Sequence, residues 1–170
     1  HSPSIIQGNM CNFKLNQTYD LISIGFNSFL HLLTDTEVIS FLDCVKKHMN
    51  NNSRFIIDIF VPNPLFLYRP EGVRFNVLEY IDSKSKNTIV VEESNEYDFE
   101  TEVNKITWYF SSNETKDFDK KYFSMRMFFP SKMNQMLIEA GFTILHQWGD
   151  YYRTPLGEGS KLQIYDLCLP

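Results

Sequence analysis

The pattern of apolar and polar positions begins with a strand, a turn, a helix and a second strand. Residues 21–24 form a short apolar run containing β-branched side chains, which is typical of a buried strand. The run ends at Gly25, and apolar positions at three- and four-residue spacing predict a helix over about 35–49. After Arg54, residues 55–60 are apolar except at Asp58, so we expect a second strand over 54–60 with helices on both of its faces.

The segment between the first strand and the helix is the first place to look for function. Thr34 and Glu37 have the spacing of a capping box, which marks where the helix begins. A strand, a loop and a helix in this order form the repeating unit of an open parallel sheet. Ligands in such sheets bind outside the carboxyl ends of the strands. We therefore expect residues 25–31 to lie at a binding site.

The middle of the chain has a different pattern. From about residue 74 to 129, long runs alternate between apolar and polar residues and are separated by polar turns, which predicts an antiparallel meander inserted into one domain of 170 residues. After it, Pro130 begins a helix that stops at Gly141. Residues 142–148 and 162–169 then predict an antiparallel pair at the sheet edge, the second strand alternating in polarity. A short strand is also expected within residues 5–10.

Composition narrows the classes of partner. The net charge of −5 and a pI near 5.3 argue against nucleic acid, since phosphate binding needs clustered lysines and arginines. No apolar run is long enough to span a membrane. The three cysteines are scattered, which favours a reducing compartment, and we expect a cytoplasmic protein. No histidine or cysteine spacing indicates a metal site.

The order of several short motifs resembles the class I S-adenosylmethionine-dependent methyltransferases, in particular the small-molecule type with a β-insert. The resemblance covers nearly the whole chain. It rests on Ile6-Gln7-Gly8-Asn9-Met10, Tyr19-Asp20-Leu21-Ile22, Phe26-Asn27-Ser28-Phe29-Leu30-His31-Leu32, Asn52-Ser53-Arg54-Phe55-Ile56-Ile57-Asp58 and Glu139-Ala140-Gly141-Phe142. It implies an α/β fold: a partial Rossmann-like methyltransferase sheet with an antiparallel β-meander insertion.

The resemblance also implies a cofactor, an acceptor and site residues. The cofactor is S-adenosylmethionine, and the acceptor is a small molecule. The implied cofactor-binding residues are Gly8, Asn9, Met10, Gly25, Phe26 and Asn27. The implied catalytic residue is His31, a candidate general base because the ordinary pKa of histidine is near 6.5. The implied acceptor-binding residues are Tyr68, Arg69, Arg126, Trp148 and Tyr152. The alternatives are a packed, hydrogen-bonded histidine, an ordinary loop at 8–10 and a well-packed insert.

Two features of the family pattern have no counterpart in the sequence. These are the glycine-rich loop after the first strand and the acidic residue that holds the ribose. We therefore expect a truncated methyltransferase with impaired cofactor binding, or, as the alternative, a non-catalytic interaction or oligomerisation domain of the same fold. The strand at 21–24 should then be a sheet edge, which is a pairing site. We expect Ile5 and Ile6 to fold over it, or a second subunit to cover it as a homodimer.

Overall fold

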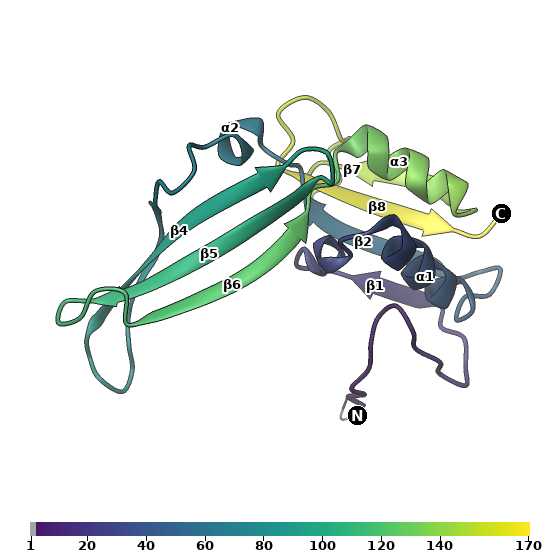
Figure 1. Ribbon diagram of the computed structural model, residues 1–170. Coiled ribbons are helices and arrows are strands. Elements are labelled where there is room, and N and C mark those ends of the chain that lie inside the picture. The colour runs from purple at the N-terminus through teal and green to yellow at the C-terminus, as the bar shows by residue number, and fades with distance from the viewer. Residues whose placement is uncertain (1–2) are drawn as a thin grey trace. The chain divides into compact units, whose positions relative to one another are not determined.

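The computed structural model describes residues 3–170, and the chain divides into two compact units (Figure 1). Unit 1 consists of the described residues up to Val61 together with Phe128–Pro170. Unit 2 is Pro62–Met127 and contains the antiparallel meander. In the described residues, no helix is both long and apolar enough to cross a membrane.

Unit 1 is built on a four-stranded sheet with the order β1-β2-β8-β7. Its elements are β1 (Leu21–Ile24), the 3-10 helix η1 (Ser28–His31), α1 (Asp35–Lys46), β2 (Arg54–Phe60), α3 (Pro130–Glu139), β7 (Thr143–Trp148) and β8 (Leu162–Cys168). β1 and β2 are parallel, whereas β8 runs antiparallel to both β2 and β7. The carboxyl ends of β1, β2 and β7 therefore meet at one edge of this sheet.

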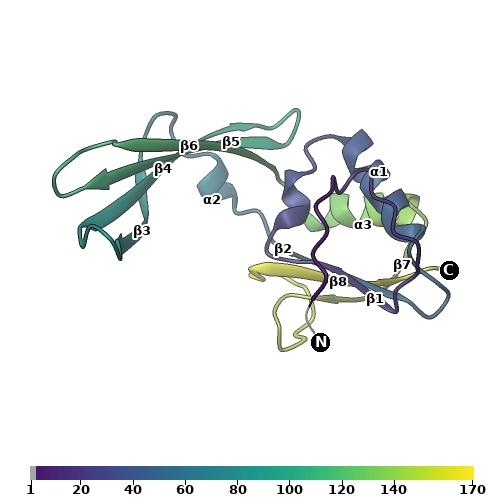
Figure 2. The ribbon, with the colours of Figure 1, turned by 90° about the horizontal axis from the view of Figure 1, so that it is seen from below.

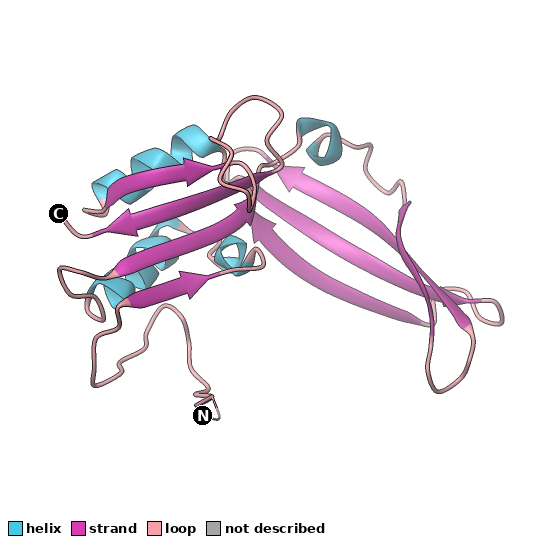
Figure 3. Cartoon of the chain, turned by 180° about the vertical axis from the view of Figure 1, so that it is seen from behind, coloured by secondary structure: helices cyan, strands magenta, loops and turns pink. Residues whose placement is uncertain are grey.

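The core of unit 1 lies between the sheet and its two longer helices, α1 and α3. Both helices cover the same face of the sheet (Figures 2 and 3). Phe55 of β2 is fully buried on this face, where its ring lies against Phe41 of α1 and Phe142 after α3. Phe29 of η1 packs edge-on against Phe128 in the same layer. Aromatic contacts thus join β2 to α1 and to the segment after α3, and they join η1 to the segment before α3.

The local signals in the sequence define the ends of the helices. The Glu37 amide donates to Thr34 Oγ1 at 3.2 Å, and the Glu37 carboxylate accepts from the Thr34 amide at 2.9 Å, so the predicted capping box is confirmed. α1 ends at Lys46, three residues before the expected end. Gly141 follows α3 with a φ of 86°, the left-handed conformation expected at a helix stop.

Several sequence-based expectations for unit 1 are wrong. β2 alternates between buried and half-buried positions, because the helices that the structure describes in unit 1 cover only one face of the sheet. β1 is likewise an edge strand with Leu21 64% exposed, and not a buried one. β8 lies between β2 and β7 and is buried on both faces, so its expected alternation is absent.

The N-terminal arm also differs from its expectation. Residues 5–10 form no strand, and instead an isolated bridge joins Asn9 to Asn12. Ile5 and Ile6 are both exposed, so they do not fold over β1 as one version of the edge hypothesis required. The predicted position of β1 at the sheet edge is confirmed. A short arm with no strand hydrogen-bonded beside it gains little stability from an extended backbone.

Unit 2 is a four-stranded antiparallel sheet in the sequential order β3-β4-β5-β6, as the alternating pattern predicted. Its elements are α2 (Pro64–Leu67), β3 (Phe75–Ile81), β4 (Thr88–Asp98), β5 (Val103–Ser112) and β6 (Asp119–Arg126). Ile89 and Val91 of β4 are buried on one face, together with Ile106 of β5. The Asn95 side chain donates to the Leu67 carbonyl at 3.2 Å and so attaches α2 to the sheet.

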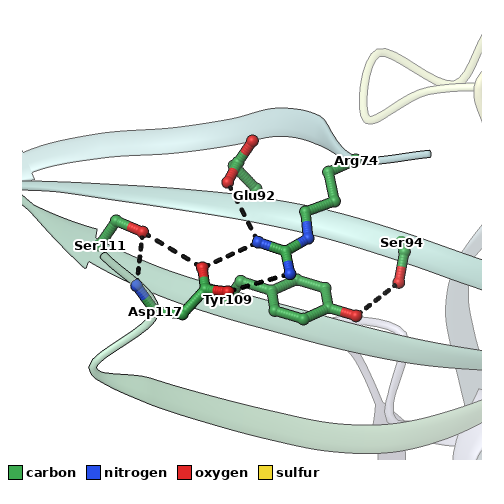
Figure 4. Close-up of polar contacts among 6 residues, drawn as sticks. All are labelled: Arg74, Glu92, Ser94, Tyr109, Ser111 and Asp117. Carbon is green, nitrogen blue, oxygen red and sulfur yellow. Dashed lines mark hydrogen bonds and ion pairs between the residues drawn. The ribbon is translucent and has the colours of Figure 1, made fainter. Parts of the chain in front are cut away.

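A polar network on the other face of this sheet is organised by Arg74 (Figure 4). Its guanidinium donates to both carboxylate oxygens of Asp117, at 2.8 and 3.0 Å, and lies 3.6 Å from Glu92. The same group stacks on the Tyr109 ring at 3.5 Å from its centroid. This geometry links the start of β3 to β4, to β5 and to the turn before β6.

The network predicts a pKa change in an arginine variant. The hydrogen bond from Arg74 lowers the pKa of Asp117 below its ordinary value. The pair therefore stabilises the fold fully above the ordinary carboxyl pKa, and this contribution is lost as the pH falls through the lowered value. In Arg74→Gln, the pKa of Asp117 should rise toward its ordinary value, as measured by NMR titration. An unchanged pKa would contradict the pairing, and Lys84→Gln, which removes an exposed charge elsewhere in unit 2, is the matched control.

Candidate functional site

A tight turn after β1 forms the first part of the candidate site. The Ser28 amide donates to the Gly25 carbonyl at 3.1 Å and closes the turn over Phe26 and Asn27. Both central residues have a positive φ, 52° and 60°, which is uncommon for an aromatic residue such as Phe26. Strained backbone of this kind persists where the surrounding structure holds it and clusters at ligand sites.

The end of β2 holds this turn in place. The Phe60 amide donates to Asn27 Oδ1 at 2.8 Å, and the Asn27 amide donates to the Asp58 carbonyl at 3.3 Å. The Asn27 side-chain oxygen is thus engaged in joining the two strand ends. Phe26, the other central residue of the turn, is 96% exposed. The turn therefore presents an aromatic ring to solvent at the carboxyl end of β1.

A carboxylate and a phenol complete the cluster. The Tyr151 hydroxyl, from the connection between β7 and β8, donates to Asp58 Oδ2 at 2.7 Å. This hydrogen bond raises the pKa of Tyr151 above its ordinary value. The same Asp58 oxygen would lie 3.8 Å from a Cβ placed on Gly25, so the carboxylate borders the turn. We call Gly25, Phe26, Asn27, Asp58 and Tyr151 the strand-end cluster.

The strand-end cluster has the chemistry of a site for a partly cationic or hydroxylated small molecule. The Asp58 carboxylate accepts hydrogen bonds from ammonium, amine or hydroxyl groups. The Phe26 ring offers a flat surface for apolar or cationic groups. The chain backbone at Gly25 can be approached closely because only Asp58 lies near the missing side chain.

Among the residues predicted to contact the cofactor, Asn9 and Met10 lie on a turn of the N-terminal arm, and Gly8 directly precedes it. Asn9 Oδ1 accepts from the Cys11 amide at 2.8 Å, and the Asn9 carbonyl accepts from the Asn12 amide at 3.0 Å. Gly8 and Asn9 are exposed and Met10 is half-buried. Further along the arm, the Leu15 amide donates to the Nε2 atom of buried His48 at 2.7 Å, which anchors this segment to the end of α1.

The predicted base and two predicted acceptor residues also lie in unit 1. His31 is exposed at the end of η1, in the segment that follows the strand-end turn. Trp148, at the end of β7, stacks on His146 with ring centroids 5.3 Å apart, and the Arg153 guanidinium lies 5.5 Å from the Trp148 ring. Tyr152 is exposed, and its amide donates to Asp150 Oδ1 at 2.8 Å.

The other three predicted acceptor residues lie in unit 2 and are engaged there. Tyr68 is exposed and contacts Tyr97 edge-on. The Arg69 guanidinium stacks on the Phe66 and Phe75 rings at 4.4 and 4.0 Å. Arg126 is buried, with its guanidinium 3.0 Å from the carboxylate of Glu102. An acceptor-binding role for these residues stays a prediction.

Sequence reasoning missed the pair of Asp58 and Tyr151. The sequence patterns assign no site role to either residue. The one available signal was the isolated acid in the otherwise apolar run that became β2. Its partner lies 93 residues further along the chain, and no local pattern indicates so distant a contact. In the described residues, no group of three His, Cys, Asp or Glu side chains is arranged to hold a metal ion.

Comparison with solved structures identifies the fold of this chain. No protein-family model and no curated protein sequence matches the chain. A solved S-adenosylmethionine-dependent methyltransferase from Clostridium acetobutylicum matches with a TM-score of 0.79 and 16% identity, over 99% of this chain and 65% of that one. The CcbJ methyltransferase from Streptomyces caelestis matches with a TM-score of 0.76 and 17% identity, over 97% and 63%.

A third solved structure agrees with these two. The sugar N-methyltransferase KedS8 from Streptoalloteichus matches with a TM-score of 0.65 and 14% identity, over 94% of this chain and 60% of that one. The chain thus spans less than two thirds of the length of each of these structures. At such low identity the likeness concerns the fold alone, but it covers almost every residue of the chain. This protein therefore has the class I methyltransferase fold, a Rossmann-like sheet carrying an antiparallel β-meander.

Proposed function

We propose that this protein takes part in S-adenosylmethionine-dependent methyl transfer to a small-molecule acceptor. The observation that carries the proposal is the strand-end cluster at the carboxyl ends of β1 and β2, in a chain that matches methyltransferase structures along nearly its whole length. Ligands of open α/β sheets bind at this edge. Among the similar structures, a glycopeptide N-methyltransferase was crystallised with S-adenosylmethionine and with S-adenosylhomocysteine.

The side chains of the strand-end cluster and of the N-terminal arm suit parts of S-adenosylmethionine. The exposed Phe26 ring and the Asp58 carboxylate suit a ligand that carries positive charge and apolar carbon together. Gly8, Asn9 and Met10 would contact the adenine, with the Asn9 side chain as a neutral hydrogen-bonding group. When bound, the cofactor supplies a methyl group activated on a sulfonium sulfur.

The remaining roles belong to the acceptor. Asp58 would accept a hydrogen bond from the acceptor amine or hydroxyl, and the hydrogen bond from Tyr151 would hold that carboxylate in place. His31 would remove the proton that the acceptor releases. Trp148 and Tyr152 would contribute aromatic surface around the acceptor. Methyl transfer needs mainly alignment and exclusion of water, which rigid aromatic and backbone groups provide.

We further propose that the chain binds the cofactor weakly by itself. The glycine-rich loop and the ribose-binding acid of the family pattern have no counterpart in its sequence. The edge of β1 is where further polypeptide would add, because Leu21 is exposed there and borders a groove of about 470 Å³ with Ile6, Phe13 and Tyr19. We propose that the partner at this edge is a second copy of the chain. We also propose a cytoplasmic location, because Cys11, Cys44 and Cys168 are free cysteines.

The same exposed edge favours one other function. A domain that only pairs through β1 would be a non-catalytic interaction module with this fold. Sedimentation of the purified chain tests the pairing. A dimer that Leu21→Lys converts to a monomer would support pairing at β1, whereas a wild-type monomer at all concentrations would contradict it.

Calorimetric titration with S-adenosylhomocysteine tests the proposed cofactor use. We expect weak binding by the wild-type chain and roughly fivefold weaker binding by Phe26→Ala, because an aromatic contact is lost. Phe99→Ala, which removes an exposed phenylalanine from unit 2, is the matched control and should bind like the wild type. No heat of binding at millimolar ligand would contradict cofactor use by this chain.

A further inference from the structure

One face of the unit 2 sheet carries a regular arrangement of polar side chains. In paired antiparallel strands, alternate residues point to the same face and registered partners lie side by side. The register sets Ser94 of β4, Thr107 of β5 and Tyr122 of β6 in one row. It sets Glu96, Lys105 and Ser124 in the next row. We call these six side chains the polar grid.

The polar grid lines a cavity. Its volume is about 410 Å³, within the range of small-molecule sites. The residues between the grid positions also border it, but their side chains alternate to the opposite face, so the floor is main chain. All of the lining residues belong to unit 2, so the site is complete within this unit.

A neighbouring row of side chains, centred on Tyr109, is held rigid and contacts the grid at Ser94 (Figure 4). Tyr109 lies beneath the Arg74 guanidinium, 3.5 Å from its ring centroid, and Lys120 Nζ lies 5.2 Å from the same centroid. The Tyr109 hydroxyl is 3.3 Å from Ser94 Oγ, which belongs to the grid. Arg74 is itself held by both oxygens of Asp117. Ser94 is therefore positioned before any ligand arrives, which lowers the entropy cost of binding.

The side chains of the grid suit a particular class of ligand. Tyr122 is 73% exposed and offers a flat ring, whereas Ser94 and Thr107 offer hydroxyls that donate and accept. In the next row, Glu96 adds an acceptor and Lys105, its registered neighbour on β5, adds a donor. A saccharide ring has an apolar C–H face and a rim of hydroxyls that both donate and accept. A phosphate group would meet the Glu96 charge, and a purely apolar ligand would leave the hydroxyls unpaired.

We propose that the polar grid is a saccharide-binding site, with Tyr122 as the stacking surface and Glu96, Lys105 and Thr107 as hydrogen-bonding partners. The site requires neither S-adenosylmethionine nor the strand-end cluster. It therefore goes beyond the proposed methyl transfer and does not depend on it.

Saturation-transfer NMR on the full chain, without cofactor, tests this site. The probes are the methyl glycosides of glucose, galactose, mannose and xylose, each titrated to tens of millimolar. We expect saturation of the ring protons of at least one glycoside. Its affinity should fall roughly tenfold in Tyr122→Ala, because an aromatic stacking surface is lost. Glu96→Gln should also weaken it, through the loss of a charged acceptor.

A matched variant controls for the loss of a tyrosine. Tyr80 is a partly exposed tyrosine of β3 that pairs with Ile89 and so lies on the opposite face, and Tyr80→Ala should bind the glycoside like the wild type. Saturation of no glycoside, or an affinity that Tyr122→Ala leaves unchanged, would overturn the proposal. Concentration-dependent self-association that Tyr122→Ala abolishes would also overturn it, because the face would then be an interface between copies of the chain.

Discussion

Replacing Phe55 with alanine should lower the free energy of unfolding by about 3–5 kcal/mol. Phe55 is 0% exposed and lies between α1 and the segment after α3, against Phe41 and Phe142. Alanine would leave a cavity at the point where both helices meet the sheet, and a packed interior can fill such a space only in part. Chemical denaturation of the variant and the wild type measures the difference.

Phe26→Ala is the matched control for this substitution. It removes the same atoms from a side chain that is 96% exposed, and we expect the free energy of unfolding to change by less than about 0.5 kcal/mol. Equal losses in the two variants would contradict the assignment of the core to the helix-covered face. The comparison also separates stability from binding, since Phe26→Ala should impair binding of S-adenosylhomocysteine.

Gly149→Ala should have the second large effect, lowering the free energy of unfolding by about 1–3 kcal/mol through overpacking. A Cβ on Gly149 would lie 2.9 Å from Ser160 Cβ and closer still to its hydroxyl. The surrounding backbone cannot yield easily, because the Gly149 amide donates to the Thr154 carbonyl at 2.7 Å and its carbonyl accepts from the Leu162 amide. These hydrogen bonds shape the connection that carries Tyr151, so the hydrogen bond to Asp58 should weaken as well.

A second glycine of the same connection provides the comparison. A Cβ on Gly157 would meet nothing within 4 Å, so Gly157→Ala should leave stability nearly unchanged. Thermal denaturation of both variants distinguishes close packing at one position from a general need for flexibility in the connection. If both variants lose the same stability, close packing against Ser160 is not the reason for glycine at position 149.

The sequence predicts several elements of secondary structure correctly, because the signals for these elements are local. A capping box beside an apolar stripe, at Thr34 and Glu37, is sufficient to define where α1 begins. Long runs of apolar and polar residues likewise predict β4 and β5, and the buried face of β4 follows directly from the period of two. Gly141 marks the end of α3 by its left-handed backbone.

The features that the sequence does not reveal depend on distant partners. An apolar run such as β2 looks the same whether helices cover one face of the sheet or both. The central place of β8 follows from its pairing with β2, more than one hundred residues earlier in the chain. The commitment of the Asn27 side chain to the Phe60 amide is equally non-local, so a residue predicted to contact the cofactor proves to join two strands.

We propose that the strand-end cluster binds the cofactor in this methyltransferase fold. Titrating the ¹⁵N-labelled chain with S-adenosylhomocysteine and following the backbone amides tests it most directly, because even weak binding moves the resonances. We predict that the largest shifts fall in residues 8–10, 25–31, 58–61 and 149–152. Shifts confined to other parts of the chain, or none at millimolar ligand, would contradict the claim.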